Sequence, residues 1–466
     1  MIRSKHYDVI IVGAGPAGIF AALELCRQSK ARVLLLEKGA ALDKRRCATQ
    51  GEYGRCLRCR PCAITCGWGG AGAFSDGKLT LSTEFGGFLN EYLDPPQLEQ
   101  LIRYVDGIYL TAGAKDVLFG TDREVVNELQ RQAAAAGLHL IPARIRHLGT
   151  ENCYRVLEEF HHQLEKEMDI ATGTEVASIV AAGGRVAGVE LASGERIGAD
   201  FVICGPGRAG AEWMQGEAVR LGLAGTNNPV DIGLRVEVPA VLLEPLTEKV
   251  YEPKLIYFSP SFDDRVRTFC MNPYGIVVTE NNNGLVTVNG HSYAEKRSDN
   301  TNFALLVSKT FTEPFDEPIR YGKYIASLAN MLGDGVIVQR LGDLQMGRRS
   351  TAERIRRGLV QPTLAEATPG DLSLVLPYRH LLSIMEMLEA LDKLAPGVNS
   401  PHTLLYGVEV KFYSFRLRLT RHLETGLANL FAVGDGAGVT RGLIQASVSG
   451  VVAAREILRR LQQPAV

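Results

Sequence analysis

A glycine-rich run near the start of the chain has the residue types and the spacing that bind a diphosphate. It reads Gly13-Ala14-Gly15-Pro16-Ala17-Gly18, between a β-rich stretch at residues 7–12 and a helical pattern at residues 19–28. Gly13 permits a tight turn, Gly15 lets the backbone approach a pyrophosphate, and Gly18 lets helix and strand pack closely. Unpaired N–H groups at the positive helix end would face the phosphate charge. The missing N–H of Pro16 suits a first helical turn.

An acidic residue follows at the place where a dinucleotide site needs one. Glu37 closes a second expected strand, residues 33–36, and lies 19 residues after Gly18. A carboxylate there accepts hydrogen bonds from the ribose hydroxyls of an adenosine and repels a 2′-phosphate. The neighbouring Lys38 is included in the predicted site. The alternative interpretation is a glycine turn in an unrelated βα unit, and the complete pattern argues against it.

The far end of the chain distinguishes between the dinucleotides that such a loop could hold. A buried strand is expected at residues 430–433, then Gly434 and Asp435, then a helix at residues 444–461. A carboxylate at the carboxyl end of a strand points into the ligand crevice, where Asp435 would accept a bond from a ribityl hydroxyl of FAD. The helix N-terminus would face the flavin C2 carbonyl and stabilise reduced flavin. NAD has no ribitol, so the pairing favours FAD; the alternative is a simple capped turn.

These features resemble the glutathione-reductase-type FAD superfamily, through the glycine run, an expected β-meander at residues 174–207 and the closing Gly-Asp. More specifically, Gly69-Gly70-Ala71-Gly72-Ala73-Phe74-Ser75-Asp76-Gly77-Lys78 resembles the family called NAD(FAD)-utilising dehydrogenases, as do residues 204–208, 230–237 and 407–410. The resemblance implies no defined substrate, but it implies FAD binding by six residues, with the adenine beside the backbone of Val176. The six are Gly13, Gly15, Gly18, Glu37, Gly434 and Asp435.

A second glycine pattern, Gly205-Pro206-Gly207-Arg208-Ala209-Gly210, also follows an expected strand. No second strand ending in an acid follows it at the right distance, and neither does a basic residue suited to a 2′-phosphate. We interpret it as a turn leaving the FAD sheet rather than as an NAD(P) site.

A cysteine-rich loop has the spacing of an iron–sulfur ligand set. Cys56-x2-Cys59-x2-Cys62-x3-Cys66 repeats the bacterial ferredoxin run, with Cys47 nearby. A [4Fe–4S] cluster here would take Cys66 or Cys47 as its fourth ligand and would pass single electrons to the flavin. Three alternatives stay open, namely a structural zinc, a redox disulfide and unligated thiols.

Three side chains are candidates for catalysis. Lys78 follows the glycine-rich run and is the candidate for a cation facing the flavin, while His147 and His291 are candidate acids or bases near neutral pH. A lone histidine is more often structural, which is the alternative for both. Arg235 and Arg267 could stabilise reduced flavin or bind a carboxylate. The alternative for both is a surface ion pair, which is the commoner role of an arginine in a β-rich segment.

The composition is that of a globular protein of more than one domain. The chain has 466 residues, 46% hydrophobic and 22% charged, with a net charge of −1. This charge gives no reason to expect nucleic acid or an anionic membrane as partner, and no apolar run is long enough to span a membrane. Five of the nine cysteines fall between Cys47 and Cys66, which favours a reducing cytoplasm over a disulfide framework.

The pattern of elements predicts an α/β fold, a discontinuous Rossmann-type FAD-binding domain with a β-meander and an inserted α+β substrate domain. The expected segments are residues 1–85, with the cysteine loop, a helical insertion at 86–140, a second FAD-domain part at 141–226, the substrate domain at 227–404 and a third FAD-domain part at 405–466. Within the substrate domain, residues 302–309 were expected to be helical.

The sequence thus predicts an FAD-dependent dehydrogenase or reductase acting on an organic small molecule. The cysteine spacing adds the expectation of an iron–sulfur relay and a redox partner protein. Two other classes stay open. One is a flavin-dependent enzyme that modifies a macromolecule such as tRNA, and the other is a non-catalytic electron-transfer module.

Overall fold

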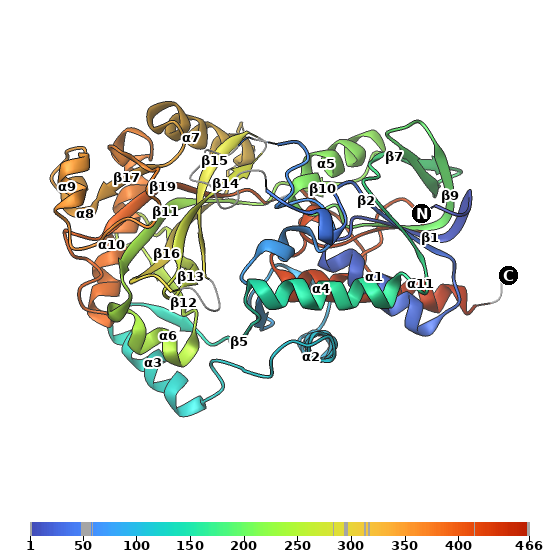
Figure 1. Cartoon of the computed structure of the whole chain (residues 1–466), viewed down its shortest axis with the longest axis horizontal. Helices are drawn as coiled ribbons and strands as arrows, with labels where there is room; N and C mark the ends of the chain where they lie inside the picture. The colour runs from blue at the N-terminus through green and yellow to red at the C-terminus, as the bar shows by residue number, and fades with distance from the viewer. Residues whose placement is uncertain are drawn as a thin grey trace. The chain divides into compact units, whose positions relative to one another are not determined.

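The computed structural model describes residues 2–47, 57, 59–282, 284–292, 297–311, 314–315, 317–413 and 415–463. The chain forms two compact units, coloured along the chain in Figure 1. The first unit consists of Met1–Asp116, Arg146–Asn228 and Tyr413–Val466, and the second of Val117–Ile145 and Pro229–Phe412.

The first unit is built on a mixed sheet whose central strands are parallel. Its order is β6-β2-β1-β9-β8-β7, and β21 also pairs with β9. The pairs that join β6, β2, β1, β9 and β21 are parallel, whereas β7, β8 and β9 pair antiparallel as a meander. These strands are β1 (His6–Val12), β2 (Val33–Glu37), β6 (Asp169–Thr172), β7 (Val176–Ala182), β8 (Arg185–Leu191), β9 (Arg196–Cys204) and β21 (Leu430–Ala432).

Parallel strands end at one edge of a sheet, so β1, β2, β9 and β21 bring their carboxyl ends to the same edge. The strands are apolar on both faces, as a sheet covered by helices requires, and the α/β class with a Rossmann-type sheet is confirmed. The helices of this unit are α1 (Pro16–Gln28), α2 (Pro95–Thr111), α4 (Thr150–Leu164), α5 (Ala211–Arg220) and α11 (Leu443–Leu461). Its shorter strands are β3 (Lys78–Leu81), β10 (Gly225–Thr226) and β20 (Arg416–Leu417).

Helices α1 and α11 lie along each other in the first unit, as Figure 1 shows. Their backbones approach closely because Gly450 has no side chain. A Cβ built on Gly450 would lie 2.0 Å from the carbonyl oxygen of Ala17, far inside any real contact. This approach brings the start of α1 next to the segment that precedes α11.

The second unit is an eight-stranded, largely antiparallel sheet of order β18-β17-β19-β11-β16-β13-β12-β4. Its strands are β4 (His139–Ile141), β11 (Val230–Pro239), β12 (Lys254–Phe258), β13 (Arg265–Asn272), β16 (Asn300–Lys309), β17 (Ile337–Arg340), β18 (Thr368–Pro369) and β19 (Leu404–Lys411). A hairpin of β14 (Ile276–Asn282) and β15 (Leu285–His291) adds a further sheet. The helices are α3 (Arg123–Ala135), α6 (Glu244–Val250), α7 (Pro318–Gly333), α8 (Leu341–Gln345), α9 (Ala352–Arg356) and α10 (Tyr378–Leu394).

One face of this sheet makes the core of the second unit. In β11 the residues Val230, Ile232, Leu234, Val236 and Val238 join a buried apolar cluster, together with apolar side chains of α10. The alternate residues of the strand face the other way, as the two-residue period of a strand requires. Strand β5 (Arg144–His147) spans the point where the chain passes from the second unit to the first.

Some expected boundaries differ from the observed ones. The expected helix at residues 302–309 is the strand β16, which pairs with β11 and β13 and is buried on both faces. The segment expected to begin at residue 405 starts inside β19, which belongs to the second unit because it pairs with β11 and β17. The helical stretch 86–140 divides, α2 going to the first unit and α3 to the second. Among the described residues, no helix is both long enough and apolar enough to cross a membrane.

The close contact between α1 and α11 gives a stability prediction. Gly450→Ala should lower the free energy of unfolding by about 1–3 kcal/mol, because the new methyl forces two packed helices apart. Urea unfolding of the full chain measures this change. The matched control is Gly216→Ala in α5, where a Cβ meets no atom within 4 Å and the protein should keep or gain stability. Equal stability of the two variants would contradict this account of the packing.

Candidate cofactor-binding site

The glycine run forms the turn between β1 and α1. Gly13 has φ +101°, and a Cβ there would lie 2.3 Å from the carbonyl oxygen of Gly205. A Cβ on Gly18 would lie 1.9 Å from the carbonyl oxygen of Gly13, so both positions require glycine. Gly15 differs, because its missing side chain faces open space. Helix α1 has Gly15 as its N-cap, without a capping side chain, so its first N–H groups are available to an anion.

Glu37 is held by the backbone of three loops. Its Oε2 accepts from Ala14 N at 2.9 Å, and its Oε1 accepts from Gly39 N at 2.8 Å and from Gly67 N at 2.9 Å. The side chain is buried, at 6% exposure. A carboxylate has about four lone-pair sites, so Oε2 retains room for one further donor. The expected ribose hydroxyl is a donor of that kind.

The connection from β6 to β7 runs beside the end of β2. Thr174 N donates to Glu37 O at 2.8 Å, and Gly173 N donates to Gly39 O at 2.8 Å. Val176 begins β7 two residues later and is buried. Its backbone therefore follows directly on the segment bonded to Glu37, where the resemblance places the adenine. Lys38 lies between Glu37 and Gly39 and is half-buried.

Asp435 follows β21 and lies close to the start of α1. Gly434 has φ +73°, and a Cβ there would lie 3.0 Å from the Cβ of Ala17. The Asp435 Oδ1 accepts from Thr440 Oγ1 at 2.7 Å, while Oδ2 lies 3.8 Å from Arg208 Nε. Burial raises the pKa of the Asp435 carboxyl. The glycine run and the closing Gly-Asp, over 400 residues apart in sequence, thus meet around Ala17.

The run from Gly69 to Lys78 lies against the glycine run between β1 and α1. Gly69 N donates to Ala14 O at 2.8 Å, and a Cβ on Gly70 would lie 3.1 Å from the Cα of Gly15. Lys78 begins β3, where its Nζ lies 2.9 Å from Asp76 Oδ2 and both side chains are nearly buried. This lysine is therefore the partner of a carboxylate within the same run.

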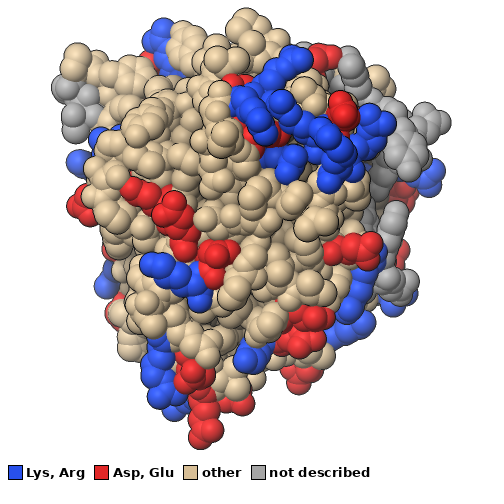
Figure 2. All heavy atoms as spheres, turned by 90° about the vertical axis from the view of Figure 1, so that its left-hand side faces the viewer, with Lys and Arg blue, Asp and Glu red and all other residues tan. Residues whose placement is uncertain are grey.

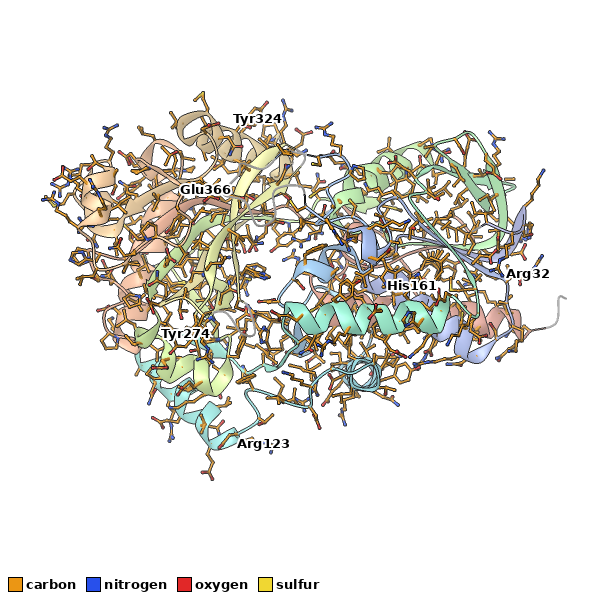
Figure 3. All side chains as sticks on the ribbon, in the orientation of Figure 1. Arg32, Arg123, His161, Tyr274, Tyr324 and Glu366 are labelled. Atoms are coloured by element: carbon orange, nitrogen blue, oxygen red, sulfur yellow. The ribbon has the colours of Figure 1, made fainter. Side chains whose placement is uncertain are left out.

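Arg45 organises the loop that leads into this run. Its guanidinium donates to four carbonyl oxygens at 2.5–3.0 Å, those of Ala63, Ile64, Trp68 and Gly70. Burial lowers the pKa of Arg45 to about 10. Trp68 is fully buried, its Nε1 donates to Leu157 O at 2.9 Å, and its ring meets the edge of His161, which Figure 3 labels on α4. These contacts fix the loop to α4 and hold it beside the glycine run.

The cysteine loop is described only in part, and Cys56 lies outside the described residues. Cys59 is exposed, Cys62 is half-buried and Cys66 is buried, and burial raises the pKa of the Cys66 thiol. Within the described ranges, no group of three or more Cys, His, Asp or Glu side chains comes together as a metal site. The cluster and zinc interpretations, with Cys47 as alternative ligand, stay predictions.

The two candidate histidines belong to different units. His147 ends β5 in the first unit, and His291 ends β15 in the second. Neither unit alone holds both. The second glycine pattern directly follows β9, where Gly205 N donates to Val12 O at 2.8 Å, and a short helical turn then leads into α5.

Sequence reasoning missed two groups that shape the site. Arg45 stands in an aperiodic stretch, and its partners are backbone carbonyls, so no side-chain pattern could mark it. Thr440 lies in the segment between Asp435 and α11, and a hydroxyl five residues after the acid is a signal that could have been used.

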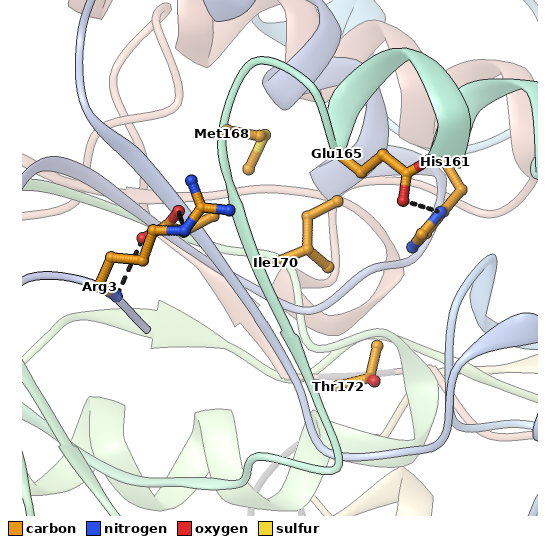
Figure 4. A pocket seen from close by; sticks show the side chains of 7 residues that line it. Arg3, His161, Glu165, Met168, Ile170 and Thr172 are labelled. Atoms are coloured by element: carbon orange, nitrogen blue, oxygen red, sulfur yellow. Dashed lines mark hydrogen bonds and ion pairs between the residues drawn. The ribbon is translucent and has the colours of Figure 1, made fainter. Parts of the chain in front are cut away.

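A separate hollow of about 220 Å³ lies beside the edge strand β6 and the end of α4 (Figure 4). Its lining includes two ion pairs, Arg3 with Asp169 and His161 with Glu165. None of the residues of the glycine run or of the closing Gly-Asp lines it. Its charges are paired, and it is distinct from the candidate cofactor site.

Comparison with known families finds one matching domain model in each of the two units. Residues 8–51 match the FAD binding domain model, and residues 230–412 match the model of the FAD-dependent protein, C-terminal domain-like. These matches identify an FAD-binding domain in the first unit and an FAD-dependent C-terminal domain in the second. An uncharacterized protein of Clostridium beijerinckii is 27% identical over 98% of this chain and 81% of its own length.

Several solved structures are similar over most of the chain. Glycine oxidase from Geobacillus kaustophilus is 13% identical, with 99% of this chain and 97% of that chain covered and a TM-score of 0.41. L-proline dehydrogenase from P. horikoshii is 11% identical, with 97% and 93% covered and a TM-score of 0.41. Similarity this low bears on neither substrate nor reaction.

The three backbone bonds to Glu37 give a prediction for binding and stability. In Glu37→Gln only one oxygen remains, so at least one of three buried N–H groups loses its acceptor. We expect a loss of about 1–3 kcal/mol in the free energy of unfolding and weaker FAD binding. Chemical unfolding and fluorescence titration with FAD measure the two effects. Glu175→Gln, at an exposed position just before β7, is the control and should change neither.

Proposed function

We propose that this chain holds FAD across the carboxyl edge of its first sheet and uses it to oxidise or reduce an organic small molecule. Bound flavin supplies the exchange of electrons with the substrate. The residues of the chain supply binding, orientation and electrostatics. The observation that carries the proposal is the contact of Gly434 with Ala17, which sets Asp435 beside the loop of Gly15.

The proposed roles follow from the contacts already given. The N–H groups at the start of α1 bind the diphosphate beside Gly15, whose open face gives room for it. The free acceptor site of Glu37 takes a ribose hydroxyl of the adenosine. Val176 presents backbone to the adenine, and Asp435 takes a ribityl hydroxyl. Gly13, Ala14, Pro16, Ala17, Gly18, Lys38 and Gly434 complete the proposed FAD-binding set.

Three side chains are proposed as catalytic groups. Lys78 is held against Asp76, in a segment that lies against the glycine run, and would act as a cation near the cofactor. His147 and His291 are proposed as proton carriers, because an imidazole titrates near neutral pH.

The FAD assignment has a direct test. Full-length protein, reconstituted with FAD and desalted, should retain about one FAD per chain, measured by absorbance after heat release. Asp435→Asn should raise the dissociation constant for FAD about tenfold, since it removes a charged acceptor worth roughly 1.4 kcal/mol. Asp43→Asn, at an exposed position in the same unit, is the control. Failure of the wild-type chain to bind FAD at all would overturn the proposal.

A cluster in the cysteine loop is proposed separately, on the spacing of Cys56, Cys59, Cys62 and Cys66. The guanidinium of Arg45 donates to the carbonyl oxygens of Ala63 and Ile64, which places a cation in the loop between Cys62 and Cys66. Zinc, with the same thiolates, is the alternative.

Metal analysis of anaerobically purified protein decides between these possibilities. A [4Fe–4S] cluster predicts about four iron and four sulfide per chain and a visible absorbance that dithionite bleaches. Zinc predicts one metal ion without that absorbance. Protein that contains neither metal, after expression with both metals supplied, would contradict both proposals. The remaining interpretations would then be a redox disulfide or unligated thiols. Cys62→Ser should lower the metal content, whereas Cys26→Ser, outside the loop, should not.

The alternative function is the modification of a macromolecule such as tRNA. A protein that binds such a polyanion needs a long basic surface. Exposed or half-buried arginines gather around α9, at the end of the molecule that Figure 2 turns toward the viewer, where Figure 2 shows one blue patch. They are Arg348, Arg349, Arg354, Arg356 and Arg357. The rest of that face mixes both signs of charge (Figure 2), so this face does not provide a long basic surface for a macromolecule.

A further inference from the structure

The turn between Asp435 and α11 carries an arginine with an unusual environment. Arg441 N donates to Gly86 O at 2.6 Å, which fixes the backbone. The guanidinium lies over the ring of Tyr413, 3.4 Å from its centroid, and 4.8 Å from that of Phe88. Stacking on aromatic faces holds the guanidinium plane but satisfies none of its N–H groups.

Two nitrogens of this guanidinium have no acceptor. In the part of the chain that the structure describes, Nε and Nη2 of Arg441 are buried without a hydrogen-bond partner. A guanidinium is always charged in proteins, and an unmet buried donor of a charged group costs free energy. The arrangement therefore calls for an acceptor that the described protein atoms do not provide.

An unmet acceptor lies in the first turn of α11. Gln445 is buried, at 3% exposure, and its Oε1 has no donor among the described atoms. Its Nε2 donates to Ser82 O at 3.1 Å and to Phe85 O at 3.0 Å. Because both partners are carbonyls, they fix the orientation of the amide and leave Oε1 as the unmet atom.

Both side chains therefore lie against the same short stretch, residues 82–88, and they present opposite hydrogen-bonding characters. The same turn also holds the proposed ribityl acceptor, since Thr440 Oγ1 donates to Asp435 Oδ1 at 2.7 Å. In FAD the ring system is attached directly to the ribitol. The ring's pyrimidine edge carries a carbonyl at C2, an N–H at N3 and a carbonyl at C4, an alternation of acceptor and donor that matches Arg441 and Gln445.

We propose that Arg441 and Gln445 bind the pyrimidine edge of the flavin, Arg441 donating to the C2 carbonyl and Gln445 accepting from N3–H. This assignment rests on the proposed binding of FAD through Asp435. Two-electron reduction with uptake of one proton leaves a negative charge at N1 and the C2 carbonyl. Arg441 is a fixed cation there, so it stabilises reduced FAD more than oxidised FAD.

The first test measures the midpoint potential of bound FAD against a reference dye. Arg441→Met should lower the ratio of affinities for reduced and oxidised FAD about tenfold, which is about 30 mV for a two-electron couple. Arg441→Lys keeps the positive charge, so the midpoint potential of bound FAD should stay close to that of the wild-type chain. Arg455→Met, in α11 at a half-exposed position, is the control. An unchanged potential in Arg441→Met with FAD bound would overturn the role of Arg441.

The second test concerns Gln445 and uses FAD methylated at flavin N3. The wild-type chain should bind it at least tenfold more weakly than FAD, because Oε1 then meets a methyl group. Gln445→Ala should bind the two cofactors with nearly equal affinity. Equal discrimination by both proteins would refute the contact with N3. If the wild-type chain binds no FAD, the proposed function itself fails, whereas FAD binding without these two effects refutes only the present assignment.

Discussion

The first unit depends on a backbone contact that only glycine permits. Gly450 of α11 lies against the carbonyl of Ala17, and Gly434, at the end of β21, lies against the Cβ of the same residue. Ala17 stands two residues after Gly15, so these contacts fix the distance between the diphosphate loop and Asp435. A side chain at Gly434 or Gly450 would move α11 and everything attached to its N-terminus. The packing of α1 against α11, and not a bound ligand, therefore sets the distance that a dinucleotide would have to span between Gly15 and Asp435.

Buried polar groups of this unit fall into two kinds. Glu37 accepts hydrogen bonds from backbone N–H groups and Arg45 donates to backbone carbonyl oxygens, so both organise the loops before any ligand binds. Arg441 and Gln445 each have buried polar atoms that find no partner among the described residues. An unmet buried polar atom costs about 1–3 kcal/mol, which a ligand returns when it supplies the missing partner. Satisfied groups therefore mark the scaffold, and unsatisfied groups mark the place that a ligand completes.

The sequence predicts those parts of the fold and site that depend on local pattern. Glycines at a strand–helix turn, and acids at strand ends, are determined within a few residues. In the structure Gly13 lies in the turn between β1 and α1, Glu37 ends β2, and Asp435 follows β21. Strand β16 was mistaken for a helix because it is buried on both faces, so the alternation that marks a strand is absent. Arg45 and Arg441 could not be recognised, since their partners are backbone carbonyls and rings that lie far away in the sequence.

The second unit shows a different use of alternation. Arg235 of β11 is fully buried and donates to both oxygens of Glu409 in β19, each at 2.7 Å, where a surface ion pair was expected. Its Nη1 also donates to Asn302 of β16. Apolar residues would stabilise such a position equally well, so a buried pair is weak as a stability device. Its firm consequence is geometric: alternate residues of β11 build the apolar core on one face, and the other face holds buried charged residues such as Arg235 in fixed positions.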